Sequence, residues 1–591
     1  MKRVPFGFYC LLLLLTAVVL APVCPAFQQI PGRDAGVFMY VGSQVLDGQV
    51  PYRDLWDHKQ PLIFLVNAIG LGLSGGSLWG VWAMEFASLF AAAVLAFRAL
   101  RKAFGAGAAA VGLSGAMVTL GVVLHGGNYT EEFALPFQFG ALALLVDAEQ
   151  NQRYGWRSVA LGMCAAAAFL FKQSLIGITA GIGLYLLIRA LLGQRSYFLH
   201  LAGMLGGALL AVGAVVAYFA LNGALLDYWQ LAFGYNQAYS NLGLLERLKA
   251  ILDELEYMST LPGLALGLAA WVAGVIVILR RFAGDILGFL GRRWIAPAAL
   301  VLGALLVALA FSSDYLLGSA QGGFGLTQIA ALLLGLAFLG LGVLVWRGTL
   351  PQRVYLAEFP AHRLQGAGLA LLAVAVMAYP IELVLIGLSA RNYVYYYITL
   401  TPVVSLLLTW LAFSLLRFHD ERYPQVGLAV AAAMLVTIAL SPAIALPSQL
   451  RPGIDQQIAD AVQYVEAHTG QEDTVLVWGA EAMVNFLSGR QAPSRYSYLY
   501  PLYMPSYSTP QRVGKLADDI ATHRPVLILD TRDADTPFLE EAPAGQCDTS
   551  AEGRPEGMQA IFQYVCEHYE LVDHVGAGAW RVYRWKEGGG Q

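Results

Sequence analysis

Long apolar runs separated by short polar segments fill the chain as far as about residue 446. The runs span approximately 5–27, 78–97, 106–124, 133–147, 158–171, 174–188, 199–220, 259–279, 294–311, 327–346, 366–388, 398–416 and 425–446. Crossing about 30 Å of hydrocarbon takes roughly 20 helical residues, and most of these runs approach that length. The pattern therefore predicts an α-helical polytopic membrane protein with about 13 transmembrane helices. The short runs on either side of Lys172 form either two spans or one broken pair.

The distribution of Lys and Arg predicts how these spans are oriented. If Lys2 and Arg3 hold the N-terminus in the cytoplasm, alternation places 18 Lys/Arg on the inner side and seven on the outer side. This bias follows the positive-inside rule. We therefore expect a multi-pass plasma-membrane protein whose first run is a retained anchor; a signal peptide is the alternative. The seven outer basic residues are candidates for anion binding: Arg33, Arg53, Lys59, Lys172, Arg247, Lys249 and Arg391.

From about residue 451 the pattern changes to alternating helical and strand-like segments. It predicts amphipathic helices at 456–468 and 558–569 and short buried strands at 474–479 and 526–530. Alternation of this kind is typical of a small α/β domain.

Composition divides the chain at the same point. A hydrophobic content of 58% and a mean hydropathy of +0.59 exclude an ordinary soluble globule. Residues 1–447 carry a formal net charge of +5, whereas residues 448–591 carry −9. We expect 1–447 to form a multi-spanning transmembrane domain and 448–591 a soluble α/β domain. An odd number of spans places the second domain outside the cytoplasm.

The five cysteines follow the same division. Cys10, Cys24 and Cys164 lie in or beside apolar runs and are expected to act as small hydrophobic residues. Cys547 and Cys566 lie in the polar part, where an oxidising compartment permits a disulfide. We predict that these two cysteines pair.

Charged residues are concentrated between Gln28 and Gln60, in a segment predicted to be an external loop. Asp34 lies between Gly32 and Gly36, where a substrate can approach the backbone closely. A carboxylate at the membrane surface suits a general base for a hydroxyl acceptor. The alternative is an Asx turn or the N-cap of a short helix.

The same segment ends in Asp54, Asp57, His58 and Lys59, just before Pro61. A lysine at this depth places its ammonium beside a lipid phosphate while its stem lies along apolar surface. Simple snorkelling toward the membrane surface is the alternative.

Two further outer segments carry candidate chemistry. Glu131 and Glu132 open a span, where one of them orients an acceptor or holds a divalent metal ion with Asp34, or both simply favour the helix N-terminus. Arg391 precedes Tyr393 to Tyr397, and its planar guanidinium fits a phosphate. The tyrosines form an interfacial belt or line a groove for a lipid or sugar. We expect Lys59 and Arg391 to hold a donor phosphate from opposite sides.

These residues resemble a known motif. Asp34-x-Gly36-x-Phe38-x-Tyr40, followed by Gly48-x-x-Pro51-Tyr52-Arg53-Asp54-x-Trp56-x-His58-Lys59-x-Pro61, resembles the first external loop of bacterial GT-C glycosyltransferases. The nearest group is family 39, which includes protein O-mannosyltransferases and the aminoarabinose transferase of lipid A. The chain departs from this pattern at Gln60, where proline is common, and at Tyr395-Tyr396-Tyr397, where a His-Tyr pair is common.

The resemblance implies an inverting transfer of a sugar from a polyprenyl phosphate to an extracytoplasmic acceptor. By position in the motif, Asp34 is the base or acceptor-orienting acid and Lys59 meets the lipid phosphate. Glu131 and Glu132 are expected to assist catalysis. The other residues expected to bind substrate are Tyr52, Arg53, Asp54, His58, Lys172, Arg391 and Tyr396.

The sequence therefore predicts a membrane glycosyltransferase whose partners are the donor lipid, an acceptor and the bilayer, and no nucleic acid. No cofactor is required by the motifs, apart from the alternative of a divalent metal ion. Walker A and dinucleotide fingerprints are absent from the sequence, which argues against a nucleotide-driven pump. Two rivals stay open: a transporter or flippase of a polyprenyl-linked substrate, and a polysaccharide ligase or polymerase.

Overall fold

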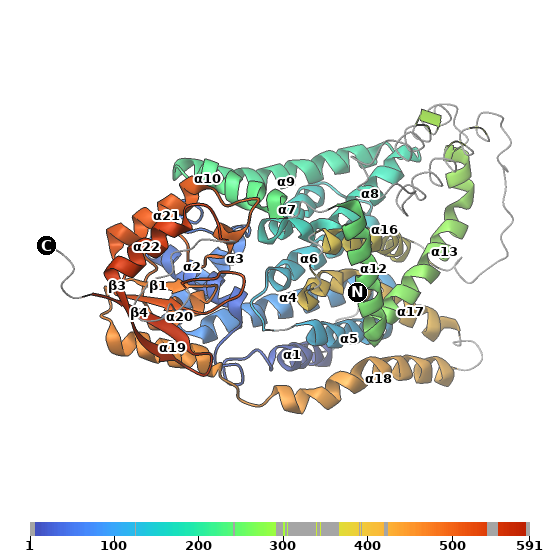
Figure 1. Cartoon of the computed structure of the whole chain (residues 1–591). Coiled ribbons are helices and arrows are strands. Elements are labelled where there is room, and N and C mark those ends of the chain that lie inside the picture. Colours follow the sequence, from blue (N-terminus) through green and yellow to red (C-terminus); the bar gives the residue numbers. More distant parts are fainter. Residues whose placement is uncertain are drawn as a thin grey trace, which may run out of the picture.

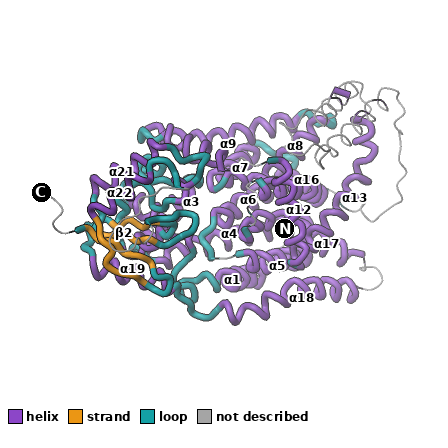
Figure 2. Tube along the Cα trace, viewed as in Figure 1, coloured by secondary structure: helices purple, strands orange, loops and turns teal. Residues whose placement is uncertain are grey.

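The molecule consists of a helical bundle and a smaller part with a β-sheet at one end of it (Figure 1). The structure is a computed structural model and describes residues 6–124, 126–239, 243–290, 366–388, 391, 393–418, 424–539 and 554–586, with single positions between 300 and 364. All the described strands lie at the end that also holds the C-terminus (Figure 2).

The bundle is made of long helices that match the predicted apolar runs. They are α1 (Phe6–Leu20), α4 (Leu78–Phe104), α5 (Ala106–Val123), α6 (Thr130–Asn151), α7 (Trp156–Phe171), α8 (Gly177–Leu191), α9 (Ser196–Leu221), α13 (Pro262–Leu290), α16 (Ala367–Gly387), α17 (Thr401–Phe418) and α18 (Pro424–Gln449). The two runs beside Lys172 form two helices, α7 and α8, joined by the 3-10 turn η1 (Gln173–Ile176).

Glycines set how closely some of these helices approach. A Cβ on Gly162 of α7 would lie 1.8 Å from the carbonyl oxygen of Met204, and one on Gly207 of α9 would lie 1.9 Å from that of Val159. Any larger residue at either position would push α7 and α9 apart. Small residues at helix contacts are the usual means of tight packing in membranes, where lipid removes the hydrophobic driving force.

Eight described helices are long and apolar enough to cross a membrane. They are Leu78–Phe104, Ala106–Val123, Gln173–Leu191, Ser196–Leu221, Pro262–Phe282, Ala367–Gly387, Val394–Leu416 and Leu428–Gln449. Three apolar helices are shorter: α1, α7 and α3 (Leu62–Ser74). The predicted runs 294–311 and 327–346 lie outside the described residues. The chain is thus a multi-pass helical membrane protein, and the number of 13 spans stays a prediction.

The C-terminal part contains a four-stranded mixed sheet. Its strands are β1 (Val475–Trp478), β2 (Leu527–Asp530), β3 (Tyr569–Val575) and β4 (Trp580–Trp585), in the order β1-β2-β4-β3. β1 and β2 are parallel, and the other two pairs are antiparallel. The helices of this part are α19 (Gln456–His468), α20 (Ala482–Ser488), α21 (Pro510–His523) and α22 (Met558–His568).

The sequence predicted some of these elements and missed others. The predicted helices and buried strands appear as α19, α22, β1 and β2. β3 was missed because only its two end residues are buried, which leaves no alternating pattern to read. The hairpin of β3 and β4 makes the sheet mixed.

The segment 28–60 is not simply a loop, as the sequence suggested. It contains α2 (Arg33–Leu46), which packs directly against α20 of the C-terminal part. A Cβ on Gly36 would lie 2.9 Å from the Cβ of Met483, so glycine permits this contact. Further along the segment, the backbone N–H of Trp56 donates to the carbonyl of Arg495 at 2.7 Å. In Figure 1, α2 and α3 lie beside the elements of the C-terminal part.

A disulfide of the C-terminal part provides a test of its location. Cys566 is disulfide-bonded, whereas Cys10, Cys24 and Cys164 are free. The predicted partner, Cys547, lies outside the described residues. We predict that peptide mapping without reductant recovers a Cys547–Cys566 peptide from protein purified from intact cells. Closing a loop of about 20 residues would stabilise the domain by about 3 kcal/mol on the chain-entropy model.

Labelling of intact cells tests sidedness. A cysteine introduced at Ala467, which is exposed on α19, should react with a membrane-impermeant maleimide in intact cells. Labelling only after the cells are broken would place this part in the cytoplasm and refute the predicted topology.

Candidate active site

Asp34 lies in the first turn of α2. The N-cap of this helix is Gly32, so the alternative that Asp34 is the cap is wrong. Its Oδ2 accepts a hydrogen bond of 3.2 Å from the hydroxyl of Tyr395, whose ring stacks on Tyr129 with centroids 4.2 Å apart. No hydrogen bond to Oδ1 is made by the described residues. The N-terminal end of the α2 dipole favours a negative charge at this position.

The turn before Pro61 is held by Asp57, which is 2% exposed. Its Oδ1 accepts the backbone N–H of Lys59 at 2.7 Å, and its Oδ2 lies 3.5 Å from the hydroxyl of Tyr498. The same hydroxyl lies 3.4 Å from Nδ1 of His58. Asp57 therefore positions the backbone from which His58 and Lys59 project.

Burial and nearby charges together set the protonation of these three side chains. It raises the pKa of Asp57 to about 6, although the hydrogen bond from the Lys59 N–H opposes this shift. It lowers the pKa of His58 well below the ordinary value of 6.5, so the imidazole is neutral at pH 7. For Lys59, burial also acts against the charge, but Asp34, Asp57 and Glu131 outweigh it and raise the pKa of the ammonium.

The raised pKa of Asp57 gives a pH-dependent prediction. Its ordinary value is 3.8, so the folded state binds the proton more tightly than the unfolded state. The stability that this group contributes is complete below about pH 4 and is lost as the pH rises through about 6. Asp57→Asn should therefore raise the free energy of unfolding at pH 7.5 by about 2–3 kcal/mol. In thermal melts of the detergent-solubilised protein, the gain should vanish near pH 4.

Asp54→Asn is the matched control with the opposite sign. The hydrogen bond from Arg53 lowers the pKa of Asp54. Its stabilising contribution is present at neutral pH and is lost on acidification, so this variant should melt earlier than wild type at pH 7.5. An Asp57→Asn difference that did not change with pH would contradict the assignment.

Two adjoining cavities meet at His58, Lys59 and Tyr396, which line both. One, the Asp34 cavity, has a volume of about 390 Å³ and is lined by Asp34, Asp57, Arg391 and seven tyrosines. The other, the lysine cavity, has a volume of about 320 Å³. Volumes of this size are typical of small-ligand sites.

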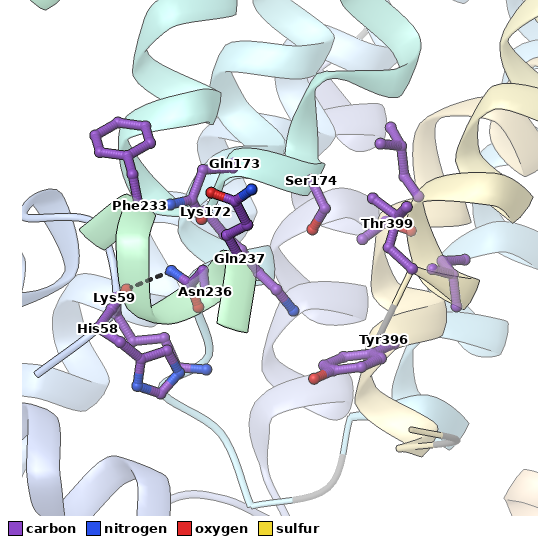
Figure 3. A pocket seen from close by; sticks show the side chains of 13 residues that line it. His58, Lys59, Lys172, Gln173, Ser174, Phe233, Asn236, Gln237, Tyr396 and Thr399 are labelled. Atoms are coloured by element: carbon purple, nitrogen blue, oxygen red, sulfur yellow. Dashed lines mark hydrogen bonds between the residues drawn. The ribbon is translucent and has the colours of Figure 1, made fainter. Parts of the chain in front are cut away.

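The lysine cavity contains two cations and an apolar side. In Figure 3, His58 and Lys59 lie on one side of it and Tyr396 and Thr399 on the other. Lys172 forms an ion pair of 2.6 Å with Glu131 and lies 3.7 Å over the Tyr396 ring. The Lys59 ammonium makes no hydrogen bond or ion pair with the described part of the chain. The apolar lining comes from Phe233, Leu385, Ile386 and Leu388.

A π-helical turn contributes to both cavities. The segment η2 (Gln230–Tyr235) places Phe233 in the lysine cavity and Tyr235 in the Asp34 cavity. Asn236 follows it and donates from Nδ2 to the carbonyl of His58 at 2.9 Å, the bond drawn in Figure 3. Single π-helical turns occur often at functional sites.

The two predicted catalytic glutamates lie behind the cavities. Glu131 is 1% exposed and accepts from Thr130 at 2.7 Å as well as from Lys172. Glu132 is 2% exposed and accepts the N–H of Tyr129 at 3.3 Å, which closes the first turn of α6. Neither lines the Asp34 cavity or the lysine cavity. Glu131 is linked to the lysine cavity by its ion pair with Lys172.

A divalent metal ion held by one of these acids with Asp34 stays a prediction. Within the described residues, no group of three or more His, Cys, Asp or Glu side chains lies close enough to hold one. Glu131 is already committed to Lys172 and Thr130.

Three residues predicted to bind substrate have structural contacts instead. Tyr52 is fully buried and donates to the carbonyl of Lys59 at 2.6 Å. Arg53 pairs with Asp54 at 2.7 Å, and Asp54 accepts the N–H of Val50 at 2.7 Å. None of the three lines either cavity. They shape the turn that presents Lys59, and we leave them out of the proposed binding site.

Arg391 and Tyr396 do lie at the cavities. Arg391 lines the Asp34 cavity only and donates to the hydroxyl of Tyr500 at 3.0 Å. Tyr396 lines both cavities under Lys172. Lys59 thus shares the Asp34 cavity with Arg391 and the lysine cavity with Lys172. A phosphate held between Lys59 and Arg391 stays a prediction.

The C-terminal part contributes residues that the sequence did not indicate. Tyr498, Tyr500, Asp533 and Asp535 all line the Asp34 cavity. Arg33 ties this wall to α2, because it pairs with Glu481 at 2.6 Å and with Asp533 at 3.4 Å. The signal in the sequence was the tyrosine-rich run Tyr496 to Tyr503. The run does not reveal that Tyr498 lies beside His58, 440 positions earlier in the chain.

Fold and site together define a polytopic membrane protein with a polar site between its helical bundle and a small α/β part. The chain belongs to the family described as "Putative competence-induced protein Ccs4 N-terminal domain", which matches residues 2–320. No curated protein matches the chain. Membership of this family does not by itself assign a reaction.

Several solved structures are similar to this one. The archaeal oligosaccharyltransferase AglB from Archaeoglobus fulgidus, in complex with an inhibitory peptide and a dolichol-phosphate, has 13% identity and a TM-score of 0.46 over 96% of this chain and 79% of its own. ArnT from Cupriavidus metallidurans bound to undecaprenyl phosphate has 14% identity and a TM-score of 0.46 over 100% of both chains. Both are GT-C proteins, the superfamily that the loop motif resembles. Similarity at this level establishes neither a shared fold nor a shared activity.

Proposed function

We propose that the chain is a membrane glycosyltransferase of the GT-C type. It transfers a sugar from a polyprenyl-phosphate-linked donor to an acceptor outside the cytoplasm, with inversion at the anomeric carbon. The observation that carries the proposal is the junction at Lys59, where the lysine cavity meets the Asp34 cavity. The Asp34 carboxylate, which would meet the acceptor, and the ammonium groups of Lys59 and Lys172, which would meet the phosphate, thus line two adjoining cavities.

The donor phosphate is assigned to the lysine cavity. Lys59 and Lys172 supply two positive charges there, and the side chains of Phe233, Leu385 and Ile386 offer an apolar path for the first isoprene units. A phosphate entering the cavity would give the Lys59 ammonium the anionic partner that the described residues do not provide. Charge-assisted hydrogen bonds of this kind are among the strongest available to a protein.

The acceptor hydroxyl is assigned to the Asp34 cavity. Oδ1 of Asp34 takes the proton from this hydroxyl, and the oxygen attacks the anomeric carbon from the face opposite the phosphate. The bond between that carbon and the phosphate oxygen breaks, and the electron pair leaves on the lipid phosphate. Lys59 stabilises the charge that grows on the leaving group. The hydroxyl of Tyr395 fixes the orientation of Asp34 through Oδ2.

The C-terminal part completes the acceptor side. Tyr498, Tyr500 and Asp533 line the Asp34 cavity and none of them lines the lysine cavity, so this part would contact the acceptor rather than the lipid. Tyrosine rings combine an apolar face with a polar hydroxyl, which suits sugars and peptides alike. The acceptor class is thus a protein, a lipid or a glycan.

The experiment compares the cell envelope of a deletion strain with that of the parent by mass spectrometry of glycans, glycolipids and glycoproteins. Loss of one sugar modification, restored by the wild-type gene and not by Asp34→Asn, is the expected result. Asp34→Asn should restore the modification if the protein only translocates a polyprenyl-linked substrate. That outcome would replace the enzyme with the transporter.

A further inference from the structure

A third cavity lies on the far side of α2. It has a volume of about 610 Å³ and is formed where the second half of α2 and the start of α4 meet the second half of α20, the segment after α20 and the segment before α2. No described residue lines both this cavity and either of the other two. Ser43, one of its lining residues, lies nine positions after Asp34, which is about 14 Å along the helix and half a turn around it.

Side-chain amides with unused hydrogen-bonding groups line this cavity. Gln29 and Gln491 are exposed, and their amides make no hydrogen bond with the described residues. Gln44 accepts one bond from Gln49 at 3.0 Å and keeps its own N–H groups available. Each amide offers two donors and an acceptor. A sugar hydroxyl, which both donates and accepts, can satisfy them.

An aromatic platform stands beside these amides. Trp79, in the first turn of α4, is 49% exposed and lines the cavity. Its ring is held edge-to-face by Trp82, with centroids 5.7 Å apart and planes at 81°. A fixed indole face suits the apolar C–H face of a pyranose ring. The amides at the same cavity then reach the hydroxyls at the edge of the ring.

The charges of the cavity argue against an anionic lipid headgroup. Arg490 is 8% exposed, and its guanidinium already donates to Oγ1 of Thr469 at 3.0 Å, to the Thr469 carbonyl at 2.8 Å and to the Ser488 carbonyl. The other charged lining residue is Asp47, whose carboxylate has no ion-pair partner among the described residues. A phosphate would therefore meet the negative charge of Asp47 and a guanidinium that is largely buried and already hydrogen-bonded through Nε, Nη1 and Nη2.

We infer that this cavity, the amide cleft, is a carbohydrate-binding site separate from the reaction site, and that it takes a neutral oligosaccharide. Its position at the contact between α2 and the C-terminal part would hold a glycan near the Asp34 cavity without placing it at the reacting atoms. The inference does not depend on the proposed reaction.

Saturation-transfer NMR on the full-length protein in nanodiscs tests the inference. The probes are mannotetraose and cellotetraose, with glycerol phosphate as the anionic comparison. At least one tetrasaccharide should bind with a Kd of about 1 mM or lower, and glycerol phosphate should not compete. Trp79→Ala should weaken binding about tenfold, and Gln491→Ala severalfold.

Two control variants show whether the binding belongs to the amide cleft. Trp156 is 66% exposed in the first turn of α7, so Trp156→Ala removes a comparable tryptophan elsewhere and should leave binding unchanged. Lys515→Ala, on the surface of α21 and outside all three cavities, should also leave it unchanged. Failure of both tetrasaccharides to bind, equal binding by Trp79→Ala and wild type, or displacement by glycerol phosphate would each overturn the inference.

Discussion

Asp34→Asn should lower sugar transfer by roughly 10²–10⁴-fold, the usual contribution of a general base. The amide has nearly the shape of the carboxylate, and its oxygen still accepts the Tyr395 hydroxyl, so α2 and the cavity should keep their structure. It cannot take a proton from the acceptor. Release of polyprenyl phosphate from a lipid-linked sugar, measured in nanodiscs, gives the rate.

Asp518→Asn is the matched control, because Asp518 lies on the exposed side of α21, away from all the cavities described above. It should transfer at the wild-type rate. If Asp34→Asn kept activity within about threefold of wild type, Asp34 would not be the base. A lower melting temperature of Asp34→Asn would point instead to a structural role.

Lys59→Ala should weaken donor binding at least about tenfold and lower the rate constant of transfer as well. One charge-assisted hydrogen bond is worth roughly 1.5–3 kcal/mol, and about 1.4 kcal/mol is a factor of ten. The rate falls too because the phosphate gains charge as it leaves, so the ammonium is worth more in the transition state than in the bound donor. The donor concentration at half-maximal rate and the single-turnover rate report the two effects separately.

Lys59→Arg should recover part of the loss, since a cation remains at the junction of the cavities. Lys515→Ala is the control: Lys515 pairs with Asp519 on the surface of α21 and lines none of the cavities. Lys172→Ala is a less direct test. It leaves Glu131 buried without its ion pair, so it should be combined with Glu131→Gln before its donor affinity is interpreted.

The sequence predicted the parts of this site that depend on local pattern. Asp34, His58 and Lys59 stood out because charge is rare in the first 447 residues and they belong to one motif. Lys172 and Arg391 stood out because the positive-inside rule makes outer cations uncommon. The structure brings all five to two adjoining cavities. Their roles in substrate binding and catalysis stay predictions.

Contacts between distant segments could not be predicted from one sequence. Nothing near Glu131 indicates that it pairs with Lys172, and nothing in the run Tyr496 to Tyr503 indicates that Tyr498 meets Asp57. Conversely, Tyr52 and Arg53 share the motif with Lys59, yet their side chains stabilise the turn itself. A motif marks both the residues that touch a ligand and those that hold them in place.

The most direct test of the account is the selectivity of lipid binding. Native mass spectrometry of the wild-type protein with equal amounts of undecaprenyl phosphate and undecaprenol compares two lipids that differ only in the phosphate. We predict one bound undecaprenyl phosphate, little undecaprenol, and loss of this preference in Lys59→Ala but not in Asp34→Asn. Equal retention of the two lipids by the wild-type protein would contradict a phosphate site at Lys59 and the donor proposed for it.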